Sequence, residues 1–285
     1  MAVYRRSYTA YSGLLTPAWS RCFVLFRYAR KSVFHSKLLT AFFAICFFFP
    51  LLCLLTIYLM HNLSFLERVG NIGPIFAIDN KFFFYFLNVQ GVLAFLLTAF
   101  VGPGLISGDL ANGALPLYFC RPFSRVEYVL GKSSVLAILL SEITWIPGLI
   151  LFVVQASLSG SHWTWDHLWI VRSLLVSSVV WIIVLALLAM TFSAWVKWRL
   201  VAGALMLAMM FFGVGFAQVV NHVLDTNFGF FFDVAYLITT IEKAAFQFGD
   251  ESAISVTSAC LALLVYGSVC LWLLMKKVRP YEVVR

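Results

Sequence analysis

The charged residues that could do chemistry gather in one short segment between two apolar runs. Residues 105–132 read LISGDLANGALPLYFCRPFSRVEYVLGK. One aspartate, one glutamate, two arginines and one lysine surround a short apolar patch in this segment. An apolar patch with a cationic rim has the chemistry to dock into a groove of a partner protein. A basic turn held only by lipid head groups would have the same composition, so the residues alone leave both interpretations open.

A second group of chemical interest is Glu142, the only acid well inside an apolar run. A charged side chain at mid-bilayer costs about 2.5–3.5 kcal/mol on insertion scales, so it should face protein or water. Glu142 could pair within a helix bundle, bind a cationic group of a substrate or relay a proton. An enzyme embedded in a membrane would need several convergent His, Asp or Glu side chains, and the apolar runs supply only this one.

The sequence gives little support for a metal site or a nucleotide-binding site. His162, Asp166 and His167 lack a further strong ligand nearby, and the tryptophans among them favour a membrane–water boundary. No CxxC or Cys/His spacing accompanies the six cysteines, so we predict neither a zinc site nor a disulfide framework. A GxxxxGK[ST] phosphate loop is also missing. We therefore expect no catalytic residues, no metal and no cofactor in this chain.

These groups are set in a very apolar chain. Its 285 residues are 62% apolar and 11% charged, whereas a soluble domain is about half apolar and about a quarter charged. A bilayer core about 30 Å thick needs about 20 apolar residues per helix, and continuous runs favour helices over a β-barrel. We predict an all-α integral membrane protein, one domain over residues 1–285, with six transmembrane helices. The expected spans are about 38–60, 83–106, 133–158, 170–192, 199–221 and 254–275.

The distribution of lysine and arginine predicts the orientation. With both termini in the cytoplasm, sixteen of the 20 Lys and Arg residues fall inside, and only Arg68, Lys81, Arg172 and Lys243 fall outside. Such an excess follows the positive-inside rule and suits the anionic lipid of the inner leaflet. The net charge of +8 is therefore explained by topology and gives no reason to expect nucleic acid. We expect a multi-pass protein of a cell membrane, either the bacterial inner membrane or a plasma membrane.

Residues 14–37, before the first span, are expected to form an amphipathic helix in the cytoplasmic interface. Thr16 followed by Pro17 is a good helix start. A basic flank that only sets the topology is the alternative. The apolar stripe of this helix would consist of Trp19, Cys22, Phe26, Ala29 and Val33.

The outer connections differ in character. Those at 61–82 and 159–169 are predicted to be short. The longer segment 222–253 contains FGFFFDVAYLITTIEKAAFQF, which is too apolar for a free loop. We expect it to dip into the membrane or to lie along its outer face as one or two short helices, since irregular backbone at that depth needs protein or a wet cavity.

With this topology, residues 107–132 form a cytoplasmic helix–turn–helix, which we call the elbow. The GPG sequence at 102–104 predicts a bend at the end of the second span, and Gly113 predicts a turn. Ser124 with Glu127 three residues later is a capping-box pattern, so a helix should begin just after Ser124 and run into the third span.

The elbow resembles the signature region of the type-2 ABC exporter permeases. Members of that family typically show an acid, Gly-Thr, an apolar patch, a run close to Arg-Pro-x-Ser-Arg, and Gly-Lys at the next span. The acid is Asp109 here, where Glu is more usual, and Ala114 stands where Thr is common. The matching residues are Asp109, Gly113-Ala114, Leu115-Pro116-Leu117-Tyr118, Arg121-Pro122-Phe123-Ser124-Arg125 and Gly131-Lys132.

The resemblance implies a permease subunit that pairs with a second permease, identical or homologous, and rests on two ABC ATPase subunits that bind ATP and Mg. The elbow would be the coupling helix, and Gly131 with Lys132 would carry the ATPase movement into the third span. The residues implied in ATPase coupling are Asp109, Gly113, Leu117, Tyr118, Arg121, Pro122, Ser124, Arg125 and Lys132.

The function expected from this resemblance is the export of a hydrophobic or amphipathic substrate. The same fold would also allow a mechanotransmitter that moves no substrate and passes ATPase motion to a periplasmic or membrane partner. In that case the outer segment at 228–248 could be the contact.

Overall fold

The computed structural model describes residues 27–28, 30–31, 33–62, 78–116, 124–248 and 252–278. These residues form helices and no strand, which confirms the all-α prediction. The elements in chain order are α2 (Lys37–Ile45), α3 (Phe48–His61), α5 (Asn80–Val101), α6 (Pro103–Ala111), α8 (Arg125–Ile143), α9 (Trp145–Ser159), α10 (Ser161–Trp195), α11 (Arg199–Leu224), the 3-10 helix η2 (Phe228–Phe232), α12 (Val234–Ala245) and α13 (Val256–Lys277).

Six helical stretches among the described residues are long and apolar enough to cross a membrane, which makes the chain a multi-pass membrane protein. Each lies over one of the six expected spans. Their bounds are Lys37–His61, Asn80–Ala111, Arg125–Ser159, Ser161–Trp195, Arg199–Leu224 and Val256–Lys277.

Three of the six spans are broken, and each break comes just before a proline. The second half-helix of each pair carries its proline in the first turn, at Pro50 of α3, Pro103 of α6 and Pro147 of α9. Proline lacks a backbone N–H and is tolerated there because that donor has no partner within the helix. The bend predicted at 102–104 is thus confirmed as the junction of α5 and α6.

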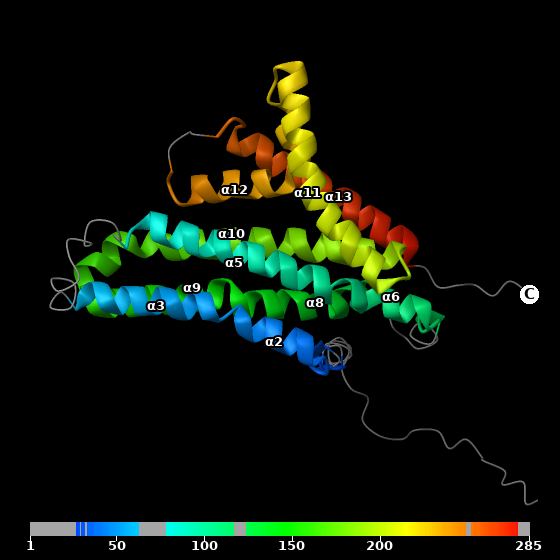
Figure 1. The fold of residues 1–285 in the computed structure, drawn as a ribbon, viewed down its shortest axis with the longest axis horizontal. Coiled ribbons are helices and arrows are strands. Elements are labelled where there is room, and N and C mark those ends of the chain that lie inside the picture. Colours follow the sequence, from blue (N-terminus) through cyan, green and yellow to red (C-terminus); the bar gives the residue numbers. More distant parts are fainter. Residues whose placement is uncertain are drawn as a thin grey trace, which may run out of the picture.

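Helix α10 forms the centre of the bundle (Figure 1). It contacts α5, α6, α8, α9, α11, α12 and α13. Its 35 residues span about 52 Å at about 1.5 Å per residue, more than the bilayer core of about 30 Å. The connection expected at 159–169 is short, but most of it is helical, because α10 already begins at Ser161. Only Gly160 separates α9 from α10, at φ 90°, and the polar residues after it are the first turns of a long helix that satisfies its own backbone.

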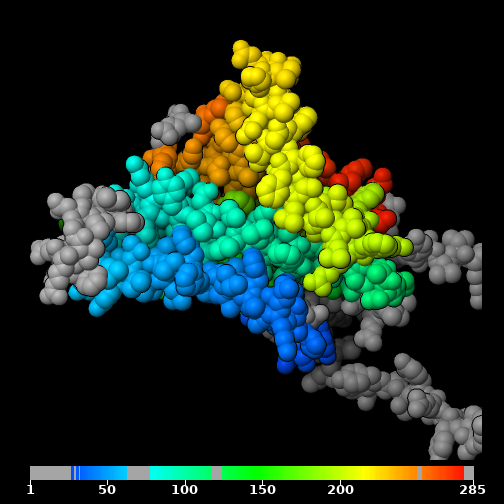
Figure 2. Space-filling model, in the orientation of Figure 1, coloured from blue at the N-terminus to red at the C-terminus, as the bar shows by residue number. Residues whose placement is uncertain are grey.

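Helices α3, α5, α9 and α10 run side by side along the long axis of the bundle, whereas α11 leaves it steeply (Figure 1). In the space-filling view the far end of α11 stands clear of the body (Figure 2). Of its 26 residues only Ala202, Met206 and Ala217 are buried.

The outer segment forms two short helices, η2 and α12, as predicted. Helix η2 folds back onto α11, where the Gly229 N–H donates to Asn221 Oδ1 at 2.7 Å and the Gly229 backbone lies against the carbonyl of Ala217. A side chain at Gly229 would collide with that carbonyl. Helix α12 then packs against α13, α10 and α11.

Candidate functional site

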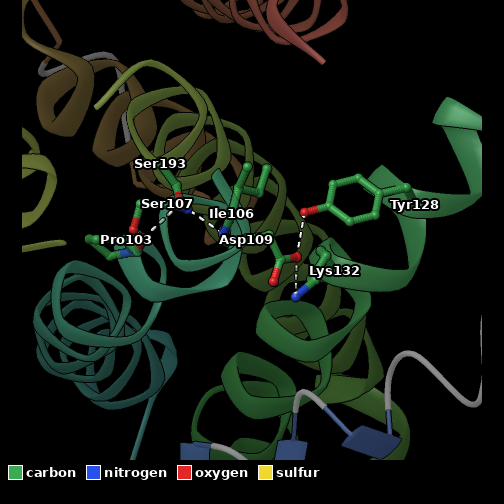
Figure 3. Close-up of polar contacts among 7 residues, drawn as sticks. All are labelled: Pro103, Ile106, Ser107, Asp109, Tyr128, Lys132 and Ser193. Atoms are coloured by element: carbon green, nitrogen blue, oxygen red, sulfur yellow. Dashed lines mark hydrogen bonds and ion pairs between the residues drawn. The ribbon is translucent and has the colours of Figure 1, made fainter. Parts of the chain in front are cut away.

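The candidate site is the elbow. Its first arm, α6, packs on α10, and one hydroxyl of α10 binds the backbone of α6. Ser193 Oγ of α10 accepts the N–H groups of Ile106 at 3.0 Å and Ser107 at 2.9 Å and donates to the Pro103 carbonyl at 2.7 Å (Figure 3). The first turn of a helix has N–H groups without helical acceptors, and the Pro103 carbonyl also accepts the hydroxyl of Ser107. Ser193 is fully buried, so its hydroxyl makes these hydrogen bonds where water has no access.

The two arms of the elbow are joined by a polar cluster of Asp109, Tyr128 and Lys132. Asp109 Oδ2 lies 2.9 Å from Lys132 Nζ and accepts a hydrogen bond from Tyr128 Oη at 2.7 Å (Figure 3). Tyr128 and Lys132 are four residues apart on α8, so they share one face of that helix. Both are buried, and Asp109 projects from α6 toward them. Removing one partner of a buried ion pair costs about 3–5 kcal/mol, so the cluster fixes α6 against α8.

The second arm begins where the capping box predicted. The Glu127 N–H donates to Ser124 Oγ at 3.1 Å, and the Ser124 N–H donates to Glu127 Oε2 at 2.7 Å. Helix α8 therefore starts at Arg125, whose side chain is exposed. The predicted turn at Gly113 is also confirmed by its φ of 63°, a conformation that glycine adopts without steric cost.

The structure thus brings together Asp109 and Lys132 of the predicted coupling residues, and it places Gly113, Ser124 and Arg125 at the ends of the two arms. Four predicted residues lie outside the described part of the chain: Leu117, Tyr118, Arg121 and Pro122. The described part of the apolar patch begins with Leu115, which is buried against the bundle.

Glu142 is paired with a cation from the segment before the first span. Its Oε1 lies 2.9 Å from Arg30 Nη2, and the two side chains are 26% and 42% exposed. A carboxylate in α8 therefore anchors the end of the predicted 14–37 helix to the bundle. The described residues of that helix are 27–28, 30–31 and 33–37, so its amphipathic character stays a prediction.

A buried acid outside the predicted site is Glu242 of α12. It is fully buried, and it accepts hydrogen bonds from Trp181 Nε1 at 2.6 Å and Asn88 Nδ2 at 3.1 Å. Burial raises the pKa of the Glu242 carboxyl to about 8. Helical spacing could have revealed it, because Glu242 follows Ile238 by four residues and so shares the apolar face of α12.

No group of three or more potential metal ligands occurs among the described residues. His162 Nδ1 pairs with Asp166 Oδ2 at 2.8 Å, whereas His167 stacks on Trp163 with ring centroids 4.4 Å apart. His162 and Asp166 thus pair with each other, whereas His167 contacts Trp163.

Comparison of the chain with protein-family models finds no matching family, and a search of curated proteins also finds no match.

Proposed function

We propose that this chain is the transmembrane permease subunit of an ATP-driven ABC exporter in a cell membrane, either the bacterial inner membrane or a plasma membrane. It pairs with a second, identical or homologous permease and rests on two ABC ATPase subunits that bind ATP and Mg. Its cargo is hydrophobic or amphipathic. The order of the signature residues supports this function, and the observation that carries it is the rigid attachment of both arms of the elbow.

The contacts of the elbow suit a part that receives force. Movement applied to the turn after Gly113 would reach α8 through the capped start at Ser124, and it would reach α6 through the ion pair of Asp109 and Lys132. Ser193 ties α6 to α10, the central helix of the bundle. Packed elements with discrete arrangements pass on such displacements more faithfully than a mobile loop does.

Each predicted residue has a role in this proposal. Gly113 makes the turn, and Ser124 caps the second arm. Asp109 and Lys132 hold the arms together. The remaining residues would face the ATPase on the cytoplasmic side, where both termini lie, and would form an apolar centre with a cationic rim. They are Leu117, Tyr118, Arg121, Pro122 and Arg125.

A mechanotransmitter is the second candidate function. The observation that favours it is the folded outer segment, where η2 and α12 pack on α11 and leave Phe228 and Phe232 exposed. Exposed aromatic side chains on an ordered element suit contact with another protein or with lipid.

The test of the proposed function uses the full chain purified from its native membrane. The variant Arg121→Glu/Arg125→Glu should lose copurifying ATPase subunits and MgATP hydrolysis, while membrane insertion is unchanged. The matched control is Lys197→Glu/Lys276→Glu, which reverses two other cations next to the spans. Unchanged ATPase binding in the elbow variant would refute the coupling role. In liposomes, ATPase stimulation by lipid or amphipathic drugs supports the exporter, whereas turnover without transport supports the mechanotransmitter.

A further inference from the structure

A polar cavity of about 280 Å³ lies beside the elbow, between α2, α5, α6, α8 and α11. A water molecule takes up about 30 Å³ in the liquid, so the cavity has room for a group much larger than water. Its polar lining is supplied by Ser36, Asp109, Asn112, Lys132 and Arg199. The rest of the lining is apolar residues and glycines, including Gly104 and Gly108.

The charge of this lining is positive. Lys132 is neutralised by Asp109 at 2.9 Å, which leaves the guanidinium of Arg199 in excess. No ion pair or hydrogen bond between described residues uses the Arg199 side chain, and the same holds for the side chains of Ser36 and Asn112. The cavity therefore presents one uncompensated cation together with hydroxyl and amide donors.

The position of Arg199 is set by its neighbours. Its Nε lies 3.5 Å from the position that a Cβ atom would take at Gly104. The absence of a side chain at Gly104 therefore lets the guanidinium approach the backbone of α6. Arg199 is the first residue of α11 and directly follows Trp198, whose side chain is 76% exposed. Tryptophan at the end of a span marks the level of the lipid head groups.

We propose that this cavity binds the phosphate group of an anionic phospholipid. Phosphate oxygens accept several hydrogen bonds at once, and arginine forms strong charge-assisted bonds to them. The head group of a lipid already lies at this level, and its acyl chains would run along the exposed apolar surface of α11 that begins at Leu200. Phosphate binding in this cavity does not require an ATPase, so this proposal is tested independently of the proposed function.

Two variants test the site by different means. Arg199→Gln removes the free cation. Gly108→Leu adds volume where a new side chain meets no atom within 4 Å, and it leaves every charge in place. The controls are Lys197→Gln, which removes a neighbouring cation outside the cavity lining, and Gly215→Leu, which makes the same glycine change in α11 at a position that is also open.

The full-length protein is purified with a defined mixture of phosphatidylglycerol and phosphatidylcholine, and the retained lipid is measured by native mass spectrometry. The wild type should retain phosphatidylglycerol in preference to phosphatidylcholine. Both test variants should lower this retention about tenfold or more, the scale of one charge-assisted hydrogen bond, and both controls should leave it unchanged.

Adding inorganic phosphate to the wild type distinguishes the two sources of the bound phosphate group, which are a phospholipid and free phosphate. A lipid site keeps its phosphatidylglycerol in phosphate buffer, whereas displacement by phosphate shows that free phosphate is the ligand and overturns the lipid assignment. Equal retention of both lipids, or full retention by Arg199→Gln, overturns the proposal. Arg199 is exposed, so that variant remains informative even if Gly108→Leu does not fold.

Discussion

Replacing Ser193 with alanine tests how much one buried hydroxyl contributes to the attachment of α6 to α10. The change removes one oxygen and almost no volume, so lost packing contributes little. It removes the side-chain acceptor of the Ile106 and Ser107 N–H groups, and it removes one donor from the Pro103 carbonyl. Side-chain hydrogen bonds in membrane proteins are worth about 0.6 kcal/mol on average and up to about 1.7. Three such bonds give a loss of about 2 to 5 kcal/mol in the free energy of unfolding.

The same helix offers a matched control. Ser177 and Ser178 of α10 are also fully buried, but their hydroxyls make no hydrogen bond in the described structure. Burying a hydroxyl without a partner is itself unfavourable, so Ser177→Ala should leave stability unchanged or raise it. The two substitutions are chemically identical and differ only in the bonds that the hydroxyl makes.

The assay is reversible unfolding in mixed micelles, followed by tryptophan fluorescence, for wild type, Ser193→Ala and Ser177→Ala. A loss of about 2 kcal/mol shifts the unfolding equilibrium roughly thirtyfold, well above the error of such titrations. Equal effects of the two substitutions, or a loss below about 0.5 kcal/mol for Ser193→Ala, would refute this account of the α6 attachment.

Three further predictions concern charged side chains. Lys132→Gln should lower the free energy of unfolding by about 3 kcal/mol because it leaves Asp109 without its cation, and adding Asp109→Asn should restore part of it in the same assay; no restoration would contradict the pairing. Burial raises the pKa of Glu242 to about 8, so the folded state binds this proton more tightly than the unfolded state. Stability should fall as pH rises from about 4.5 to 8, and Glu242→Gln should flatten this slope in unfolding curves; an unchanged slope would contradict it. The Arg30 and Glu142 charges should show a coupling of about 0.5 to 1 kcal/mol in a double-mutant cycle, small because both side chains are partly exposed, and a coupling of zero would argue against the ion pair.

The spans and the capping of the elbow could be predicted because both depend on local sequence. A run of apolar residues long enough to cross a bilayer is visible in composition alone. The start of α8 follows from Ser124 and Glu127, which bond each other within one turn. The break at 102–104 follows from proline and glycine, whose backbone restrictions need no tertiary context.

The contacts that hold the site together could not be predicted in this way. Asp109 and Lys132 are 23 positions apart, and their pairing depends on how α6 and α8 rotate about their own axes, which hydropathy does not specify. Ser193 looks like any serine in an apolar helix until α6 lies beside it. The segment of Glu242 was expected to form short helices, but its burial depends on Trp181 and Asn88, which come from α10 and α5 and are distant in the sequence.

Photocrosslinking from the elbow is the most direct test of the central claim that this part of the chain meets an ATPase. A photoreactive residue in place of Val126, which is exposed and adjoins Arg125, is illuminated in native membranes, with the same residue at Leu224, at the far end of α11, as the control. We expect position 126 to form an adduct with a subunit that carries a GxxxxGK[ST] phosphate loop, and position 224 to form none. A well-inserted chain that gives no such adduct from position 126, or equal adducts from both positions, would contradict the account.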